Sequence, residues 1–247
     1  MQASISIDKL TKKYGDVIAV DGLSLEVGEG ELFGLLGPNG AGKTTTINVL
    51  CGILEPTSGH VNVGGHDVVK ELSDVKEAIG VCPQDTAVYP FLTIKENIEL
   101  FGKMHAMPSD KLEQNLEYVM GKMRLLEWAN KRAGTCSGGI KRRLNMAMGL
   151  IHDPEIVFLD EPTVGMDVQA RHAVWDFTKE LKTRNKTVVL TTHYIEEAEQ
   201  LCDRVAIIDH GKLIALGTPA QLESKSKEKH LEDVFLKLTG SDVRGEE

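Results

Sequence analysis

The sequence has few cysteines, and they show no ordered arrangement. They include no C-x-x-C pair and do not follow the spacing of a disulfide framework (Cys51, Cys82, Cys136 and Cys202). Disulfides persist in oxidising compartments, whereas thiols inside cells are kept reduced. We therefore expect an intracellular protein that folds without disulfides.

The sequence also lacks an excess of basic residues. Lysine and arginine together number 28, against 37 aspartate and glutamate residues, and the formal net charge is −9. Nucleic acid is attracted mainly through its phosphates, which require a positive field on the protein. Nucleic acid is therefore not expected as the main partner.

Long apolar stretches are missing as well. No segment approaches the roughly 18 to 20 apolar residues that span a bilayer. The N-terminal segment MQASISIDKL has no basic region followed by an apolar core, so nothing in it indicates secretion. If the protein works at a membrane, we expect another chain to hold it there.

The patterns that are present predict an α/β protein. The chain has 247 residues, 41% of them hydrophobic, which is enough for the core of one sizeable domain. Apolar residues alternate around Ile5 and Ile7 and again from Leu23 to Val27, which indicates an antiparallel β layer. Apolar runs at 31–37, 155–160, 186–192 and 204–209 are typical of buried parallel strands.

A helical segment interrupts this pattern. Thr93 and Glu96 form a capping-box pair, and Ile94, Ile98 and Phe101 follow at helical spacing. We predict a single domain over residues 1–240. It divides into a core (1–91 and 137–217), a helical lobe (about 92–136) and a C-terminal helical tail (218–240), with residues 241–247 frayed.

Two turns are predicted near the C-terminal end. The segment 209–212 (Asp-His-Gly-Lys) separates two strand-like runs and indicates a tight hairpin. Thr218 and Pro219 indicate a helix N-cap followed by proline at the first helical position.

A phosphate-binding loop is the first chemical motif. The segment GPNGAGKTT at 37–45 follows a buried strand and precedes a helical run, as the pattern G-x-x-x-x-G-K-[ST] requires. Its glycines let backbone N–H groups converge on phosphate oxygens, the lysine supplies a charge, and the threonine hydroxyl can bind Mg²⁺. The expected phosphate-binding residues are Gly37, Pro38, Asn39, Gly40, Ala41, Gly42, Lys43, Thr44 and Thr45. The alternative is an ordinary glycine turn.

A pair of carboxylates supports the same chemistry. The run IVFLDEP at 156–162 ends in Asp160 and Glu161. Asp160 is placed to orient Mg²⁺, and Glu161 to polarise an attacking water as general base. A solvated acidic turn is the alternative, and a phosphate loop elsewhere in the chain argues against it.

The segment Cys136–Arg143 (CSGGIKRR) resembles the signature sequence of the ABC family, usually LSGGQ followed by a basic stretch. Ser137 can cap a helix while its hydroxyl and the N–H groups of Gly138 and Gly139 face an anion. By this resemblance the three residues form a second phosphate-binding surface. The alternative is a simple helix N-cap.

Other family landmarks follow in order. Tyr14 resembles the aromatic residue that stacks on adenine, and Gln84 the glutamine that contacts Mg²⁺ and the attacking water. Asp167 lies in a segment that resembles the family's D-loop, and His193 resembles its switch histidine. The resemblance covers about residues 3–217. It implies a P-loop NTPase core of the RecA type with an antiparallel β subdomain and an inserted helical subdomain.

The resemblance also implies a mechanism. Two cassettes close head to tail around two MgATP, so each ATP lies between the phosphate loop of one chain and the signature of the other. The implied cofactors are ATP and Mg²⁺, and the implied partners are ATP, a second ABC ATPase subunit and a multi-spanning membrane protein. Three residues depart from the family pattern: Cys136, Ile140 and Met166.

A role in transport is the main hypothesis. Family members of this size serve as cytoplasmic subunits held at the inner face of the cell membrane, and here the apolar segment 88–91 would contact the membrane partner. The tail HLEDVFLKLTG at 230–240 resembles exporter cassettes, which favours export. Two alternatives remain at this stage: a soluble ABC ATPase that powers another process, and a module that senses ATP without hydrolysing it.

Overall fold

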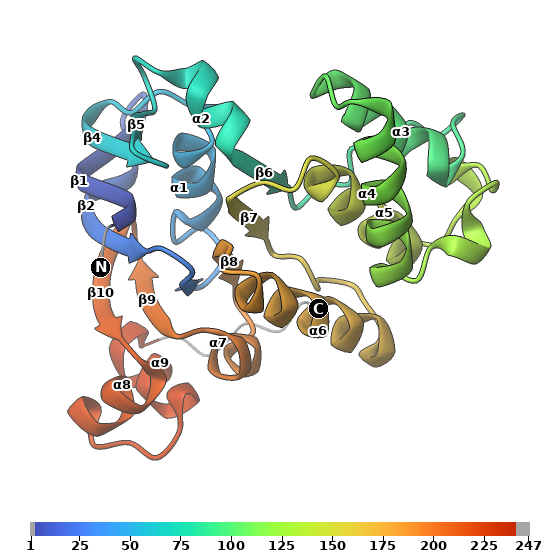
Figure 1. Cartoon of the computed structure of the whole chain (residues 1–247). Helices are drawn as coiled ribbons and strands as arrows, with labels where there is room; N and C mark the ends of the chain where they lie inside the picture. The colour runs from blue at the N-terminus through green and yellow to red at the C-terminus, as the bar shows by residue number, and fades with distance from the viewer. Residues whose placement is uncertain (1–2, 241–247) are drawn as a thin grey trace.

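The protein, described here from a computed structural model, contains two β-sheets surrounded by helices (Figure 1). The structure describes residues 3–240, so the prediction of a frayed 241–247 segment lies outside the described residues. No helix within 3–240 is long and apolar enough to cross a membrane.

The smaller sheet is antiparallel, as the alternating pattern predicts. Its order is β2-β1-β4-β5, and β1 pairs with both β2 and β4. Its strands are β1 (Ala3–Tyr14), β2 (Val17–Gly28), β4 (Ser58–Val63) and β5 (His66–Asp67).

The larger sheet has six strands in the order β10-β9-β3-β8-β7-β6. Strands β9, β3, β8, β7 and β6 are parallel, and β10 is antiparallel to β9. The predicted buried strands are therefore confirmed as β3 (Leu32–Leu36), β7 (Ile156–Asp160), β8 (Thr187–Thr192) and β9 (Arg204–Asp209), joined by β6 (Ile79–Cys82) and β10 (Lys212–Gly217).

Strand β3 is buried on both faces of this sheet. Leu32 and Leu36 belong to one hydrophobic core, while Phe33 and Leu35 belong to another, because successive side chains of a strand point to opposite faces. The second core lies against the antiparallel sheet and α1 (Lys43–Leu50). The first is covered by helices that include α6 (Val168–Thr183) and α7 (Ile195–Leu201).

The helical lobe lies between β6 and β7 in the sequence and to one side of the sheets (Figure 1). It contains α3 (Ile94–Met104), α4 (Ser109–Lys122) and the short helices η1 (Leu126–Trp128) and η2 (Ala133–Thr135). Helix α5 (Gly138–Leu150) follows and packs against both α3 and β6. It therefore connects the lobe to the sheet.

The two ends of the lobe are hydrogen-bonded to each other. The Ile94 N–H donates to the carbonyl of Lys131 at 3.0 Å, and the Ala133 N–H donates to the carbonyl of Leu92 at 2.9 Å. An isolated bridge pairs Thr93 with Arg132 at the same place. We call this junction the neck of the lobe.

Local signals account for several element ends. Thr93 and Glu96 form the predicted capping box at α3, and Thr218 caps α8 (Pro219–Ser226) with proline at the helix start. The predicted hairpin joins β9 to β10 through His210 (φ 45°) and Gly211 (φ 76°), the positive φ values that a two-residue turn of type I′ needs. The remaining helices are α2 (Leu72–Ala78) and α9 (Leu231–Thr239).

Candidate functional site

The glycine-rich segment 37–42 links the end of β3 to the start of α1. Gly42 adopts a φ of 101°, and a Cβ there would lie 2.4 Å from the carbonyl oxygen of Ala19, so only glycine fits. The Ala41 N–H donates to the carbonyl of Pro38, and the carbonyl of Ala41 accepts from Gly211 N–H at 3.0 Å. The loop is therefore held from inside and by the β9–β10 hairpin.

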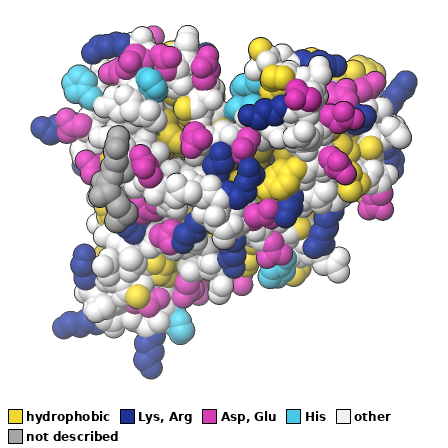
Figure 2. All heavy atoms as spheres, in the orientation of Figure 1, with side chains coloured by type: hydrophobic (Ala, Val, Ile, Leu, Met, Phe, Trp, Pro, Cys, Tyr) yellow, Lys and Arg dark blue, Asp and Glu magenta, His cyan; other side chains and the backbone are white. Residues whose placement is uncertain are grey.

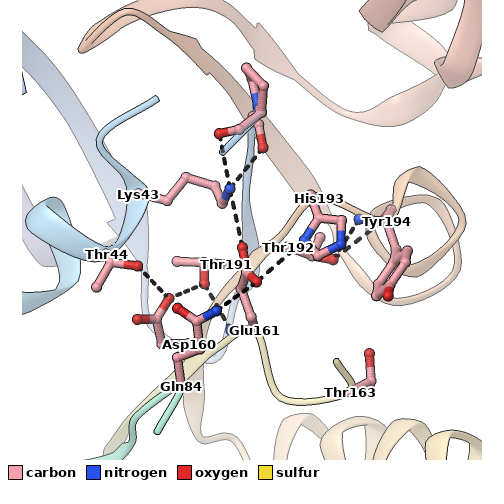
Figure 3. A network of polar contacts seen from close by, with 12 residues as sticks. Lys43, Thr44, Gln84, Asp160, Glu161, Thr163, Thr191, Thr192, His193 and Tyr194 are labelled. Atoms are coloured by element: carbon pink, nitrogen blue, oxygen red, sulfur yellow. Dashed lines mark hydrogen bonds and ion pairs between the residues drawn. The ribbon is translucent and has the colours of Figure 1, made fainter. Parts of the chain in front are cut away.

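The other polar residues come from the carboxyl ends of neighbouring strands. Asp160 ends β7, Thr191 is its register partner on β8, and His193 follows β8. Gln84 follows β6. Because parallel strands end at the same edge of the sheet, these side chains converge beside the phosphate loop (Figure 3).

Asp160 is buried between two hydroxyl groups. Thr44 Oγ1 donates to Asp160 Oδ1 at 3.3 Å, and Thr191 Oγ1 donates to the same oxygen. Burial raises the pKa of Asp160 and outweighs these two hydrogen bonds.

Glu161 lies at the centre of the network. Its Oε1 is 3.2 Å from Lys43 Nζ, while its Oε2 accepts from Gln84 Nε2 at 3.3 Å and lies 3.3 Å from His193 Nδ1 (Figure 3). Burial opposes ionisation of Glu161, but His193 and Lys43 outweigh it and lower the pKa. The side chain is therefore held as a carboxylate.

The backbone of Glu161 is unusual. Its φ is 47°, in the left-handed region that non-glycine residues rarely adopt. The Glu161 N–H donates to Thr191, both to the carbonyl at 3.1 Å and to Oγ1 at 2.9 Å. Left-handed backbone at a non-glycine residue concentrates at functional sites, where the surroundings hold it.

Lys43 reaches across the loop that carries it. Its side chain is almost fully buried, and Nζ donates to the carbonyls of Gly37 at 2.8 Å and Pro38 at 3.2 Å besides the pair with Glu161. The ammonium group therefore lies over the segment whose backbone would receive phosphate oxygens.

These groups fit a phosphate ligand with Mg²⁺. The first N–H groups of α1 have no partner within the helix, and they carry the positive end of its dipole. Thr44, Asp160 and Gln84 offer the hydroxyl, carboxylate and amide oxygens that Mg²⁺ prefers.

Five predicted residues lie outside this network. Ser137, Gly138 and Gly139 begin α5, with Ser137 and Gly138 exposed. Ser137 occupies the N-cap position, as predicted, but its hydroxyl makes no capping hydrogen bond. Asp167 is exposed and caps α6 by accepting from Ala170 N–H at 2.8 Å. Tyr14 is 47% exposed at the end of β1, with Lys12 Nζ 5.4 Å from its ring.

The three departures from the family pattern face inward. Cys136 and Ile140 are buried in the core that α3 and α5 share, and Met166 packs against it. An apolar side chain suits such a position, since an unpaired polar group there would be costly.

Three residues without a predicted role also belong to this region. Thr191 joins Asp160 to Glu161, and its register opposite Asp160 follows from the parallel pairing. Arg142 donates to the carbonyls of Gln84, Glu161 and Pro162. Glu197 is fully buried and accepts from Thr163 and Trp175. The basic stretch after Gly139 was the only sequence signal for Arg142.

Comparison with known proteins agrees with the phosphate-binding site described above. Residues 20–164, more than half of the chain, match the family model described as ABC transporter. The linearmycin resistance ATP-binding protein LnrL of Bacillus subtilis is 42% identical over 221 residues, which cover 90% of this chain and 71% of that protein. The daunorubicin resistance ATP-binding protein DrrA3 of Streptomyces coeruleorubidus is 41% identical, with coverages of 96% and 75%.

Solved structures agree on the fold. An ATP-binding subunit of an ABC transporter superposes with a TM-score of 0.88 at 24% identity, covering 95% of this chain and 98% of that one. A dimeric ATP-binding cassette bound to ADP and Pi superposes with a TM-score of 0.80 at 27% identity, covering 87% and 98%. The P-loop NTPase fold, with its antiparallel and parallel sheets, is thereby confirmed, and the chain belongs to the ABC transporter family.

Proposed function

We propose that this chain binds and hydrolyses ATP as the nucleotide-binding subunit of an ABC exporter. The observation that carries the proposal is the convergence of Lys43, Asp160 and Glu161, with Thr44, Gln84 and His193, at one edge of the sheet. A phosphate loop with its lysine, a hydroxyl and a carboxylate that can hold Mg²⁺, and a residue that can accept a proton from water are recurring parts of sites for phosphoryl transfer.

The substrate is held by residues of this chain. Backbone N–H groups of the segment Gly37–Thr45, among them those of Asn39, Gly40 and Gly42, surround the phosphates, and Lys43 balances the phosphate charge. Pro38 has no N–H and only shapes the loop. Tyr14 stacks on the adenine. Thr44, Asp160 and Gln84 hold Mg²⁺, which when bound neutralises charge on the phosphate oxygens. A bound dication also favours the ionised form of Asp160.

Hydrolysis depends on Glu161, His193 and Gln84. The carboxylate of Glu161 accepts a proton from the attacking water, for which its lowered pKa keeps it ionised. Gln84 orients that water, and His193 contacts the γ-phosphate. Gln84 and His193 both lie 3.3 Å from Oε2 of Glu161.

The functional unit is a head-to-tail dimer. Ser137, Gly138 and Gly139 lie outside the network around Glu161, exposed or half-buried, with a hydroxyl that makes no cap. They serve a second subunit by binding the γ-phosphate of its ATP, and Asp167 lies beside the shared site. A related cassette that is dimeric with bound ADP and Pi supports this arrangement.

Coupling to a multi-spanning membrane protein completes the proposal. Residues 88–91 form an apolar segment in which Tyr89 is 48% and Phe91 84% exposed, and this segment contacts the partner. The chain is thereby held at the cytoplasmic face of the cell membrane. Relatives named for antibiotic resistance and for Nod factor export support export. The domain division, with a lobe at about 92–136 between two core segments, belongs to the same proposal.

The substitution Glu161→Gln tests the assignment of the general base. The amide keeps the shape of the side chain but accepts no proton, so we expect turnover to fall on the order of 100-fold or more while ATP still binds. Light scattering should then detect an ATP-bound dimer that persists. Glu155→Gln, at an exposed position just before the same strand, is the control and should hydrolyse at the normal rate. Normal hydrolysis by Glu161→Gln would refute the assignment.

A further inference from the structure

Arg142 lies at the junction of three segments. It belongs to α5, five residues after Ser137, and its guanidinium leaves the helix toward the loops after β6 and β7. Nη1 donates to the carbonyl of Gln84, Nη2 to the carbonyl of Glu161 at 2.5 Å, and Nε to the carbonyl of Pro162 at 3.3 Å.

These contacts suit arginine in particular. A guanidinium carries five N–H donors in a rigid plane, so one side chain can bind several carbonyls at fixed angles. A lysine has a single ammonium group on a flexible stem and cannot reproduce that geometry. Burial lowers the pKa of Arg142, and the nearby Glu161 and Asp160 act in the opposite direction.

The contact with Glu161 falls on a strained peptide. The φ of 47° at Glu161 persists only where the surroundings hold the backbone. Thr191 binds the N–H of this residue, and Arg142 binds its carbonyl. The position of the Glu161 carboxylate therefore depends on a side chain of α5, the helix whose N-cap is Ser137.

We propose that Arg142 is a positioning residue that joins the Ser137 end of α5 to Gln84 and Glu161. The inference rests on the proposed ATPase function, in which Ser137 faces a nucleotide held by a second subunit. Engagement of that end of α5 then sets the backbone of Gln84 and Glu161 through one guanidinium. Arg142 touches no reacting atom in this role.

Arg143 provides a matched comparison. It is the next residue of the same helix, also half-buried, and its Nη1 donates to the carbonyls of Met123 at 3.0 Å and Arg124 at 3.2 Å. Those carbonyls belong to the lobe and not to the network around Glu161. Arg143→Gln removes the same charge from the same helix without touching the Gln84 or Glu161 backbone.

The test is steady-state ATPase kinetics of the full chain and its variants. For Arg142→Gln we expect kcat to fall on the order of 10-fold or more with KM for ATP nearly unchanged, because misplaced catalytic groups slow the chemical step. For Arg142→Lys we also expect a lower kcat. For Arg143→Gln we expect kcat to stay within about twofold of the wild-type value. In a chain that already carries Gln84→Ala, adding Arg142→Gln should lower kcat by a smaller factor than it does in the wild type, because part of the effect of Arg142 passes through Gln84.

The outcomes separate this inference from the proposed function. Any of three results would overturn the inference. Both Arg142 variants could keep the wild-type kcat, Arg143→Gln could lower kcat as much as Arg142→Gln does, or the effects of Arg142→Gln and Gln84→Ala on kcat could be fully additive. If the unsubstituted chain hydrolyses no ATP, the proposed function fails. Hydrogen exchange can then still test the contacts of Arg142. The backbone amides of residues 83–87 and 160–164 should exchange faster in Arg142→Gln than in Arg143→Gln, and equal exchange rates would overturn the inference.

Discussion

At the scale of single residues, the pKa values of two adjacent carboxyl groups are shifted in opposite directions. Burial raises the pKa of Asp160, whereas at Glu161 the neighbouring His193 and Lys43 overcome burial and lower it. Neighbouring carboxyl groups in different environments can take different roles at one pH. Here Asp160 lies between two hydroxyl groups, whereas Glu161 lies beside Lys43 and His193.

His152 is a second residue whose surroundings control its protonation. Its ring stacks on His105 with centroids 3.7 Å apart, and its Nε2 lies 3.0 Å from the Ile79 carbonyl. Burial first, then the neighbouring His105, lowers the pKa of His152 from 6.5 to about 4; Lys186 acts in the same direction and Asp153 in the opposite one. The folded state therefore holds this imidazole neutral.

This arrangement predicts a loss of stability in mild acid. Between pH 6.5 and about 4 the unfolded chain binds a proton at His152 that the folded chain does not, so stability falls as the pH falls through this range. From pH 7 to pH 5 the loss attributable to His152 is about 2 kcal/mol.

Urea unfolding at both pH values measures this loss. His152→Gln keeps an N–H donor but does not titrate. Between pH 7 and pH 5, its free energy of unfolding should therefore fall by about 2 kcal/mol less than that of the wild type. An identical pH response in wild type and His152→Gln would contradict the prediction.

At the scale of elements, one buried carboxyl joins three segments. Glu197 of α7 is fully buried, and its Oε1 accepts from Thr163 Oγ1 at 3.0 Å and from Trp175 Nε1 of α6 at 2.9 Å. Thr163 precedes Asp167 in the loop after β7, while α7 follows His193. Burial raises the pKa of Glu197, which favours its protonated form.

We expect Glu197→Gln to be tolerated and Glu197→Ala to be destabilising. Glutamine has the shape of the protonated acid and keeps the accepting oxygen, so the free energy of unfolding should change by about 1 kcal/mol or less. Alanine leaves a cavity and two unpaired buried donors, at a cost of about 3 kcal/mol. Denaturant unfolding measures these changes in the free energy of unfolding. The control is Glu196→Ala at an exposed position, which should be about as stable as the wild type.

The elements themselves were largely predictable from local signals. Alternation around Ile5, the capping box at Thr93 and the His210–Gly211 turn all depend on neighbouring residues, and the structure confirms them. The contacts of Arg142 and Glu197 join segments far apart in the chain. No periodicity encodes such contacts, and they appear only once the strands are placed side by side.

The site was predictable to a similar extent. The residues of the motifs lie where their strand ends bring them, so the convergence of Lys43, Asp160 and Glu161 follows from a parallel sheet. The cap at Ser137 could not be judged from sequence, because a serine at this position can turn its hydroxyl toward the helix or away from it.

At the scale of the whole molecule, the surface is hollowed between the sheets and the helical lobe (Figure 2). The network around Glu161 belongs to the sheets, while Ser137 stands at the start of α5 beside the lobe. In the proposed dimer, these two surfaces of one chain would each face a different nucleotide.

Mixing two inactive variants tests this division. Ser137→Arg and Lys43→Ala should each hydrolyse little ATP alone. Mixed together, they form dimers in which one site combines an intact Lys43 with an intact Ser137. We expect roughly a quarter of the wild-type rate, because random pairing makes half of the dimers mixed and each holds one complete site.

The control mixes each variant with itself at the same total concentration. Activity of Ser137→Arg alone at the wild-type rate would show that the signature serves no second subunit. A mixture no more active than its components would contradict a head-to-tail dimer of identical chains.

The neck of the lobe has a consequence for protein engineering. Its two ends, at 92–94 and 131–133, are bonded to each other, so the lobe leaves the body and returns at a single point. A lobe from a related cassette can be exchanged at this neck without cutting a strand of either sheet. Arg142 and Asn145, which bind the segment 83–87 from α5, would stay with the recipient. Residues 88–91, the proposed contact with the membrane partner, lie before the neck and would also stay with the recipient, so the exchange would alter the lobe and leave that contact unchanged.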